Sequence, residues 1–231
     1  MDNVIVKKLY DAVIEGEEEI AVEAAQESID AGMNPVEVIK SGIQGAMDEI
    51  GAQFEDGEAF LPELMLAGEA ATEAMDILLA KIKEDGGEGV EVGTVILGVM
   101  AGDHHDIGKN LVKAILSANG FKVIDMGIDV GVKTFIETAQ REKADIIACS
   151  TLITTSLPYQ KELIQTLEAM GIREKYSIIL GGGPVTSQWT KMISADGYAN
   201  TASECVSLCT QLMERSEKGG EGEPIIIGAL T

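Results

Sequence analysis

Two adjacent histidines, the only two in the chain, stand between two aspartates in the run Asp103-His104-His105-Asp106. An imidazole beside a carboxylate is a good metal ligand, because the carboxylate fixes the ring tautomer and raises the basicity of the free nitrogen. An equally open interpretation is that Asp103 caps a following helix and both histidines lie at the surface. A hydrolytic zinc site is disfavoured, since adjacent histidines do not easily share one metal and no third ligand follows at helical spacing.

Two further runs have unusual chemistry: the hydroxyl-rich segment 150–156 and the glycine-rich segment 181–184. Each follows a short apolar run typical of a buried strand, as Asp103 does. Open parallel sheets bind ligands at the carboxyl ends of their strands, so Asp103, His105 and Ser150 can converge there. The phosphate-binding patterns GxxxxGK[ST] and GxGxxG are missing at these positions. The glycines instead leave room for a large, flat group to approach the backbone.

Alternating strands and helices position these loops over the second part of the chain. Continuous apolar runs predict buried parallel strands, and amphipathic segments between them predict helices. The expected strands are 94–100, 121–124, 146–149, 177–180 and a weak fifth near Tyr198; the expected helices are 107–118, 132–141, 159–170 and 201–215. The pattern predicts a flavodoxin-like (Rossmann-like) α/β domain with a parallel sheet.

Helical periodicity dominates the first part, where four amphipathic segments predict an antiparallel four-helix bundle. The polar, glycine-rich stretch 84–89 has the composition of a linker. We therefore expect a helical domain over residues 1–88, an α/β domain over 89–218 and a C-terminal tail over 219–231. The tail either adds an edge strand, contacts a partner or is mobile.

Acidic residues dominate the 231-residue chain, whose formal net charge is −22. Residues 1–90 hold five Lys and Arg against 22 Asp and Glu, which either steers a complementary partner or keeps the bundle soluble. Such a chain is a poor nucleic-acid binder. No apolar run is long enough to span a membrane, and the N-terminus lacks a secretory signal pattern, so we expect a cytoplasmic protein without membrane contact. Three cysteines make a disulfide framework improbable.

Taken together, these motifs resemble those of cobalamin-binding domains. Asp103–Gly108 matches the DxHxxG signature, Ser150–Leu152 the SxL element and Gly181–Gly182 the glycine-rich element. The segment 54–64 looks like the helical cap of methionine synthase and of the corrinoid proteins of methyltransferase systems. Residues 182–186, followed by Trp189, are similar to the methylamine and quaternary-amine corrinoid proteins.

The resemblance implies a role for each matching residue. His105 is expected to be the lower axial cobalt ligand, Asp103 its hydrogen-bond partner and Ser150 the residue behind Asp103 in a ligand relay. His104 stands at a variable position and is expected to face solvent. Phe60 and Leu64 are expected in the cap that shelters the upper face of the cofactor. The remaining expected cofactor-binding residues are Asp106, Ile107, Gly108, Leu152, Thr154, Gly181 and Gly182.

The function implied by the resemblance is that of a methyl carrier in one-carbon metabolism, with cobalamin or a related corrinoid as cofactor. A substrate:corrinoid methyltransferase would methylate Co(I), and a corrinoid:acceptor methyltransferase would take the methyl group from methyl-Co(III). A reductive activase is the third expected partner. The carrier alone would not be a complete enzyme, and the methyl donor is expected to be a methylated amine or betaine. Two alternatives remain: the small subunit of an adenosylcobalamin-dependent mutase, and a cobalamin-binding sensor.

Overall fold

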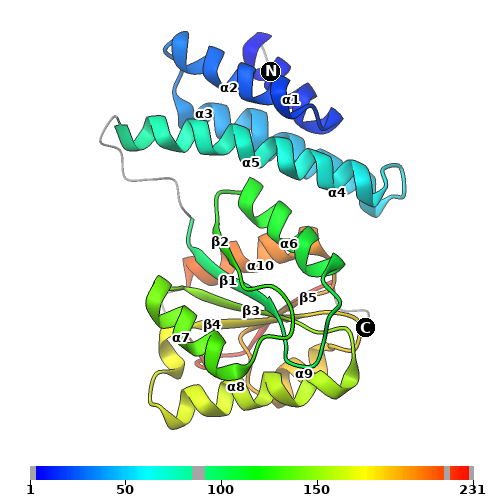
Figure 1. The fold of residues 1–231 in the computed structure, drawn as a ribbon, viewed down its shortest axis with the longest axis vertical. Helices are drawn as coiled ribbons and strands as arrows, with labels where there is room; N and C mark the ends of the chain where they lie inside the picture. The colour runs from blue at the N-terminus through cyan, green and yellow to red at the C-terminus, as the bar shows by residue number, and fades with distance from the viewer. Residues whose placement is uncertain (1–3, 85–91, 216–218, 229–231) are drawn as a thin grey trace. The chain divides into compact units, whose positions relative to one another are not determined.

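The computed structural model describes residues 4–84, 92–215 and 219–228 (Figure 1). The chain divides into two compact units. One comprises residues 1–91 with 114–120, and the other comprises residues 92–113 with 121–231. The domain boundary expected near residue 88 lies outside the described residues, so the division 1–88, 89–218 and 219–231 stays a prediction.

The first unit contains the four expected helical segments. They are α1 (Val4–Glu15), α2 (Glu18–Asp30), a long third segment and α5 (Leu61–Glu84). The third segment consists of α3 (Pro35–Val38), the π-helical η1 (Ile39–Gln44) and α4 (Gly45–Glu55). Asn34 caps its start, because the Asn34 side-chain oxygen accepts a hydrogen bond of 3.0 Å from the Val36 amide, with proline at the first helical position.

The π-helical turn follows from the spacing of the buried side chains in this third segment. The buried residues recur in pairs four positions apart: Val38 with Ile39, Gly42 with Ile43, and Ala46 with Met47. A period of four exceeds the 3.6 residues per turn of an α-helix. The wider hydrogen-bond span of the π-helix takes up the excess and keeps the pairs on one face. Gly42 packs against Leu9 there, because a Cβ at that position would lie 2.9 Å from a methyl carbon of Leu9 and would displace it.

The second unit is a six-stranded parallel sheet in the order β2-β1-β3-β4-β5-β6. Its strands are β1 (Thr94–Val99), β2 (Lys122–Asp125), β3 (Ile146–Ser150), β4 (Ser177–Gly181), β5 (Gly197–Ala199) and β6 (Ile225–Ile227). The connecting helices are α6 (Ile107–Ala118), α7 (Val132–Glu142), α8 (Leu157–Ala169), α9 (Ser187–Met192) and α10 (Ala202–Glu214). The first five strands have the flavodoxin-like order, which confirms the predicted fold class.

The helices lie on both faces of the sheet. Figure 1 shows α7, α8 and α9 on one face, and α10 with the first turns of α6 on the other. Between the sheet and α7 and α8, a continuous apolar core contains Phe135, Ile147 and Leu163, all fully buried. Because the central strands are covered on both faces, they read as unbroken apolar runs in the sequence.

Two short elements differ from the sequence-based expectation. Helix α9 has only six residues, and the hydroxyl of Thr186 caps it by accepting a bond from the Trp189 amide. The tail supplies β6, which pairs in parallel with β5, so of the alternatives for the tail the edge strand is realised. Asp196 anchors the tail, since one of its carboxylate oxygens accepts the Gly220 amide and the other binds Arg173.

No helix among the described residues is long and apolar enough to cross a membrane. The three cysteines are free and buried. Burial raises the pKa of the Cys149 thiol, as expected for a cysteine that packs as a small apolar side chain.

Candidate functional site

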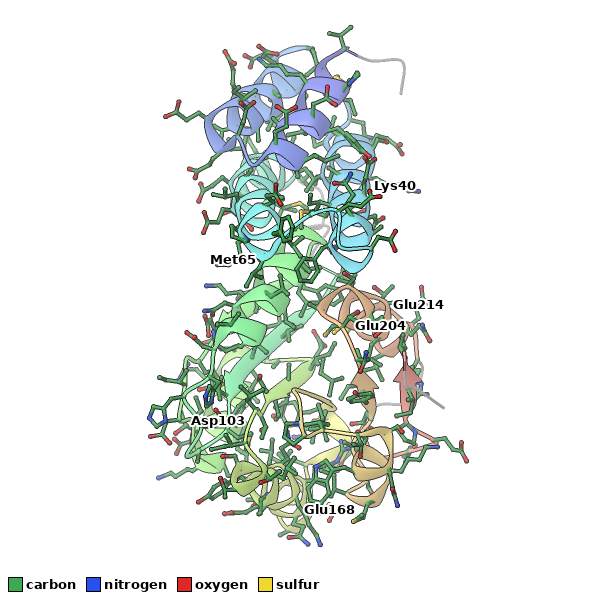
Figure 2. The ribbon with its side chains drawn as sticks, turned by 90° about the vertical axis from the view of Figure 1, so that its right-hand side faces the viewer. Lys40, Met65, Asp103, Glu168, Glu204 and Glu214 are labelled. Atoms are coloured by element: carbon green, nitrogen blue, oxygen red, sulfur yellow. The ribbon has the colours of Figure 1, made fainter. Side chains whose placement is uncertain are left out.

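Asp103 lies in the loop between β1 and α6 and is fully buried (Figure 2). Its carboxylate accepts four hydrogen bonds. One oxygen accepts the His105 amide at 3.0 Å and pairs with Nδ1 of the His105 ring at 2.8 Å. The other oxygen accepts the amides of Leu152 and Ile153, at 2.6 and 3.1 Å. The carboxylate therefore joins the end of β1 to the loop after β3.

These hydrogen bonds decide the charge state of Asp103. Burial alone would raise the pKa of the carboxyl group. The bonds from the Leu152 amide, the His105 ring, the His105 amide and the Ile153 amide outweigh burial and lower the pKa to about 2. Asp103 is therefore a carboxylate at neutral pH, which is the form that holds the imidazole proton on Nδ1.

His105 has one ring nitrogen that could hold a metal. Its side chain is 57% exposed although Asp103 beneath it is fully buried. With Nδ1 engaged by the carboxylate, Nε2 is the nitrogen left to bind a metal. His104, its neighbour, is exposed as expected. Among the residues that the structure describes, no three His, Cys, Asp or Glu side chains are grouped to hold a metal ion. A single exposed imidazole fits a metal that already has its other ligands from a macrocycle.

Loops from β2 and β3 hold the segment that carries Asp103. The Asp129 amide donates to the carbonyl of Asp103 at 3.0 Å, and the Asp129 carboxylate accepts the Gly102 amide at 2.7 Å. Ser156, which is buried, donates its hydroxyl hydrogen to the carbonyl of Ala101 at 2.8 Å. Asp129 was not identified from the sequence, and Ser156 was noted there only as part of the hydroxyl-rich segment 150–156. Their role arises from contacts between loops that are far apart in the chain.

The start of α6 is fixed by an ion pair that the sequence analysis also missed. The ammonium group of Lys109 is buried and binds Asn110 at 2.6 Å and Asp125, at the end of β2, at 2.7 Å. Asp106, which directly precedes the helix, accepts a hydrogen bond from the Asn110 side chain through its carboxylate. Burial opposes ionisation of Asp125, but the Lys109 bond and the Gly127 amide give its carboxyl a lowered pKa. The sequence signal for this ion pair was a lysine, Lys109, four positions after His105.

Exposed apolar side chains lie where β1, β2 and β3 lead into the helices that follow them. Ile107 is 66% exposed, Leu152 51% and Ile128 41%. Ile107 is the first residue of α6, Leu152 donates its amide to Asp103, and Ile128 precedes Asp129. Large apolar side chains left open to solvent at the carboxyl ends of parallel strands are typical of a ligand site.

Glycines near the carboxyl ends of the strands leave the backbone there without side chains. A Cβ built at Gly108 or at Gly181 would meet no atom within 4 Å, so both positions face open space. Gly182 is different, because its φ is +113° and a Cβ there would lie 1.9 Å from the carbonyl oxygen of Thr151. The sheet-end loops therefore offer open backbone next to an apolar rim. This arrangement fits a broad macrocycle with an appended chain.

The other expected site residues lie as follows. Ser150 ends β3, but the hydrogen bonds to the Asp103 carboxylate within the described chain come from other residues, so its relay role stays a prediction. Thr154 is exposed at the start of a 3-10 turn. In the helical unit, Phe60 is 69% exposed, and its amide donates to the Glu63 carboxylate. Leu64 is fully buried. That Phe60 and Leu64 shelter a cofactor stays a prediction.

Comparison with known proteins gives consistent matches over both units. Two family models, each described as a B12 binding domain, match residues 93–206 and 5–79. Trimethylamine corrinoid protein 1 of Methanosarcina acetivorans is 41% identical over 88% of this chain and 94% of that protein. Dimethylamine corrinoid protein 1 of the same organism is 38% identical over 90% of this chain and 97% of that protein. A chain in the methanol:cobalamin methyltransferase complex of Methanosarcina barkeri superposes with a TM-score of 0.81 at 28% identity, covering 95% of this chain and 83% of that one.

Proposed function

Because the chain belongs to the family of corrinoid proteins built from B12-binding domains, we propose that it carries methyl groups between two methyltransferases. A bound corrinoid would supply a cobalt centre able to accept a methyl group and to give it up again. We propose that the first partner is a substrate:corrinoid methyltransferase, the second a corrinoid:acceptor methyltransferase, and that a reductive activase restores the carrier. The cytoplasmic location stays a prediction.

The observation that carries this proposal is the buried Asp103 carboxylate beneath an exposed His105 ring. With Nδ1 bonded to the Asp103 carboxylate, Nε2 of the exposed ring would hold the cobalt, and the shared Nδ1 proton would make it a ligand of adjustable strength. A methyl carrier needs such a ligand, because its cobalt alternates between forms that favour and reject axial coordination.

Other residues of this chain are proposed to hold the cofactor. Ile107, Ile128 and Leu152 supply apolar contacts at the rim, and the open backbone at Gly108 and Gly181 admits the nucleotide tail. Asp106 and Lys109 keep the start of α6 in place while the ligand binds. The protein's part is thus to bind, to orient and to hold one proton at Nδ1 of His105.

For the methyl donor we propose a methylated amine. Support comes from the relatives named for trimethylamine and dimethylamine, at 41% and 38% identity. The chain from the methanol complex has 28% identity. The helical unit, with its own match to a B12 binding domain, supports a methyl carrier over the small subunit of a mutase. The test is to load the carrier and offer it trimethylamine, dimethylamine or methanol with a methyltransferase specific for each. We expect methylation with an amine, and methylation from methanol alone would exclude the amine proposal.

The axial ligand can be tested with two adjacent histidines. Hydroxocobalamin is added to the wild type, to His105→Ala and to His104→Ala, and absorption spectra are recorded after removal of free cofactor. We expect stoichiometric binding and a histidine-ligated spectrum in the wild type and in His104→Ala. His105→Ala should show an altered axial signature. If His104→Ala changes the spectrum and His105→Ala does not, the ligand assignment is wrong, and if the wild type binds nothing, the carrier proposal fails.

A further inference from the structure

A chain of side-chain hydrogen bonds leads from the surface to the loop that holds Asp103. The indole N–H of Trp189, on α9, donates to the side-chain oxygen of Gln160, on α8, at 2.9 Å. The side-chain nitrogen of Gln160 donates to the hydroxyl of Thr151 at 3.1 Å. Gln160 and Thr151 are fully buried, whereas Trp189 is half-buried. A buried glutamine with both ends of its amide bonded has one fixed orientation.

Thr151 is also fixed through its backbone. Its amide donates to the carbonyl of Gly181 at 3.0 Å. The α-carbon of Gly182 packs against its carbonyl so closely that no Cβ would fit. Neither the side chain nor the peptide of Thr151 can therefore shift without breaking contacts on two sides.

The next two residues after Thr151 are the amide donors to Asp103. Leu152 and Ile153 both bind the same carboxylate oxygen, at 2.6 and 3.1 Å. The other oxygen holds the His105 ring. The bonded path therefore runs from Trp189 through Gln160 and Thr151 to the two amides, then to Asp103 and His105, all within one compact unit.

We propose that Trp189, Gln160 and Thr151 form a positioning relay that sets the strength of His105 as a cobalt ligand. This inference rests on the proposed function and adds three residues to the site. The relay holds the two amides against Asp103, and these amides draw negative charge away from the oxygen that pairs with the ring. When the relay is broken, the amides loosen and the carboxylate takes a larger share of the Nδ1 proton. His105 then becomes the stronger ligand.

The relay predicts a direction for the redox behaviour of the loaded protein. A stronger axial ligand favours Co(II), which keeps the ligand, over Co(I), which loses it. The midpoint potential of this couple should therefore fall when the relay is broken. A threefold gain in the relative affinity of His105 for Co(II) lowers the potential by ~28 mV, from the 59 mV per tenfold change of a one-electron couple.

The experiment compares four variants of the full-length chain. Thr151→Val removes the hydroxyl but keeps the shape, and Thr151→Ser restores the hydroxyl. Trp189→Phe removes only the indole donor from the outer end of the relay. Thr190→Val is the control, because Thr190 is the buried neighbour of Trp189 and, among the described residues, its hydroxyl donates to the carbonyl of Thr186 at the start of α9 and not to the relay.

The first readout needs no cofactor. In the amide NMR spectrum of the unloaded protein, we expect the Leu152 and Ile153 protons to move upfield in Thr151→Val and, less strongly, in Trp189→Phe. In Thr151→Ser and Thr190→Val they should stay near the wild-type positions. The second readout is the Co(II)/Co(I) midpoint potential after loading with hydroxocobalamin. In Thr151→Val this potential should fall by the ~28 mV that corresponds to a threefold gain in affinity.

Each outcome bears on the relay separately from the carrier function. Unchanged amides in Thr151→Val and Trp189→Phe would overturn the relay, and so would equal shifts in Thr190→Val. Shifted amides with an unchanged potential would overturn its effect on His105. A wild type that binds no corrinoid would remove the carrier function, while the amide shifts would still decide whether the three side chains position the loop.

Discussion

Replacement of Asp103 by asparagine should cost the unloaded protein about 2 kcal/mol of stability at neutral pH. The carboxyl pKa is about 2 in the folded protein against an ordinary 3.8. A difference of just under two units, at ~1.4 kcal/mol per unit, gives this figure. Asparagine cannot replace the four accepted bonds, because its amide group presents N–H to donors on one side. For a domain of this size the loss corresponds to a melting temperature lower by about 4–8 °C.

The pH dependence gives the prediction its sign. A carboxylate with a depressed folded-state pKa contributes stability that is fully present above the unfolded value of 3.8 and is lost as the pH falls through about 2. The deficit of Asp103→Asn should therefore be the same at pH 7 and pH 5 and about half as large at pH 3. Thermal unfolding followed by circular dichroism across this range measures it.

Asp129→Asn is the matched control for this measurement. Asp129 lies in the neighbouring loop with φ +54°, a conformation that asparagine tolerates. Its carboxylate accepts the Gly102 amide, and an asparagine oxygen can accept the same bond. The reasoning is refuted if Asp103→Asn melts within about 1 °C of the wild type, or if Asp129→Asn loses as much.

Three further outcomes are expected. In Gly182→Ala the free energy of unfolding, measured by urea denaturation, should fall by more than about 2 kcal/mol, because of the positive φ and the close approach to Thr151. Gly108→Ala should be as stable as the wild type, and equal losses in the two variants would contradict the predicted clash at Gly182. Lys109→Met should lose about 2 kcal/mol in the same assay, since it leaves the Asp125 carboxylate without its buried partner; wild-type stability would show that the ion pair is dispensable. If the acidic first 90 residues steer docking, the rate at which the carrier associates with a methyltransferase should fall as salt rises from about 0.01 to 1 M. A rate that does not depend on salt in stopped-flow measurements would show that the charge serves solubility alone.

Most of the fold was readable from the sequence because each element has a local signal. The apolar runs of β1, β3 and β4 are covered on both faces, and the Asn34-Pro35 pair marks a helix start that the structure confirms. Helix α9 was missed because six residues show too little periodicity. The place of β6 depends on the bond between Asp196, which Arg173 holds, and the Gly220 amide of the tail, and no local pattern reveals this bond.

The site was predictable only where one motif contains both partners. Asp103 and His105 are two positions apart, and their pairing is seen in the structure. The amides of Leu152 and Ile153 lie about fifty positions away and are backbone groups, which every residue carries, so residue types give no sign of their role. The role of Gln160 is also hidden in the sequence, because its side chain bonds to two residues that lie on different elements.

The π-helical turn at Ile39–Gln44 has a consequence for insertions and deletions in the helical unit. Deleting one residue from an ordinary α-helix rotates everything after it by about 100° and turns buried side chains outward. The π-helical turn already contains an excess residue. Removal of the exposed Ser41 should convert this turn to plain α-helix while α4 keeps its buried face. A single-residue deletion should therefore be tolerated better within this turn than in α4.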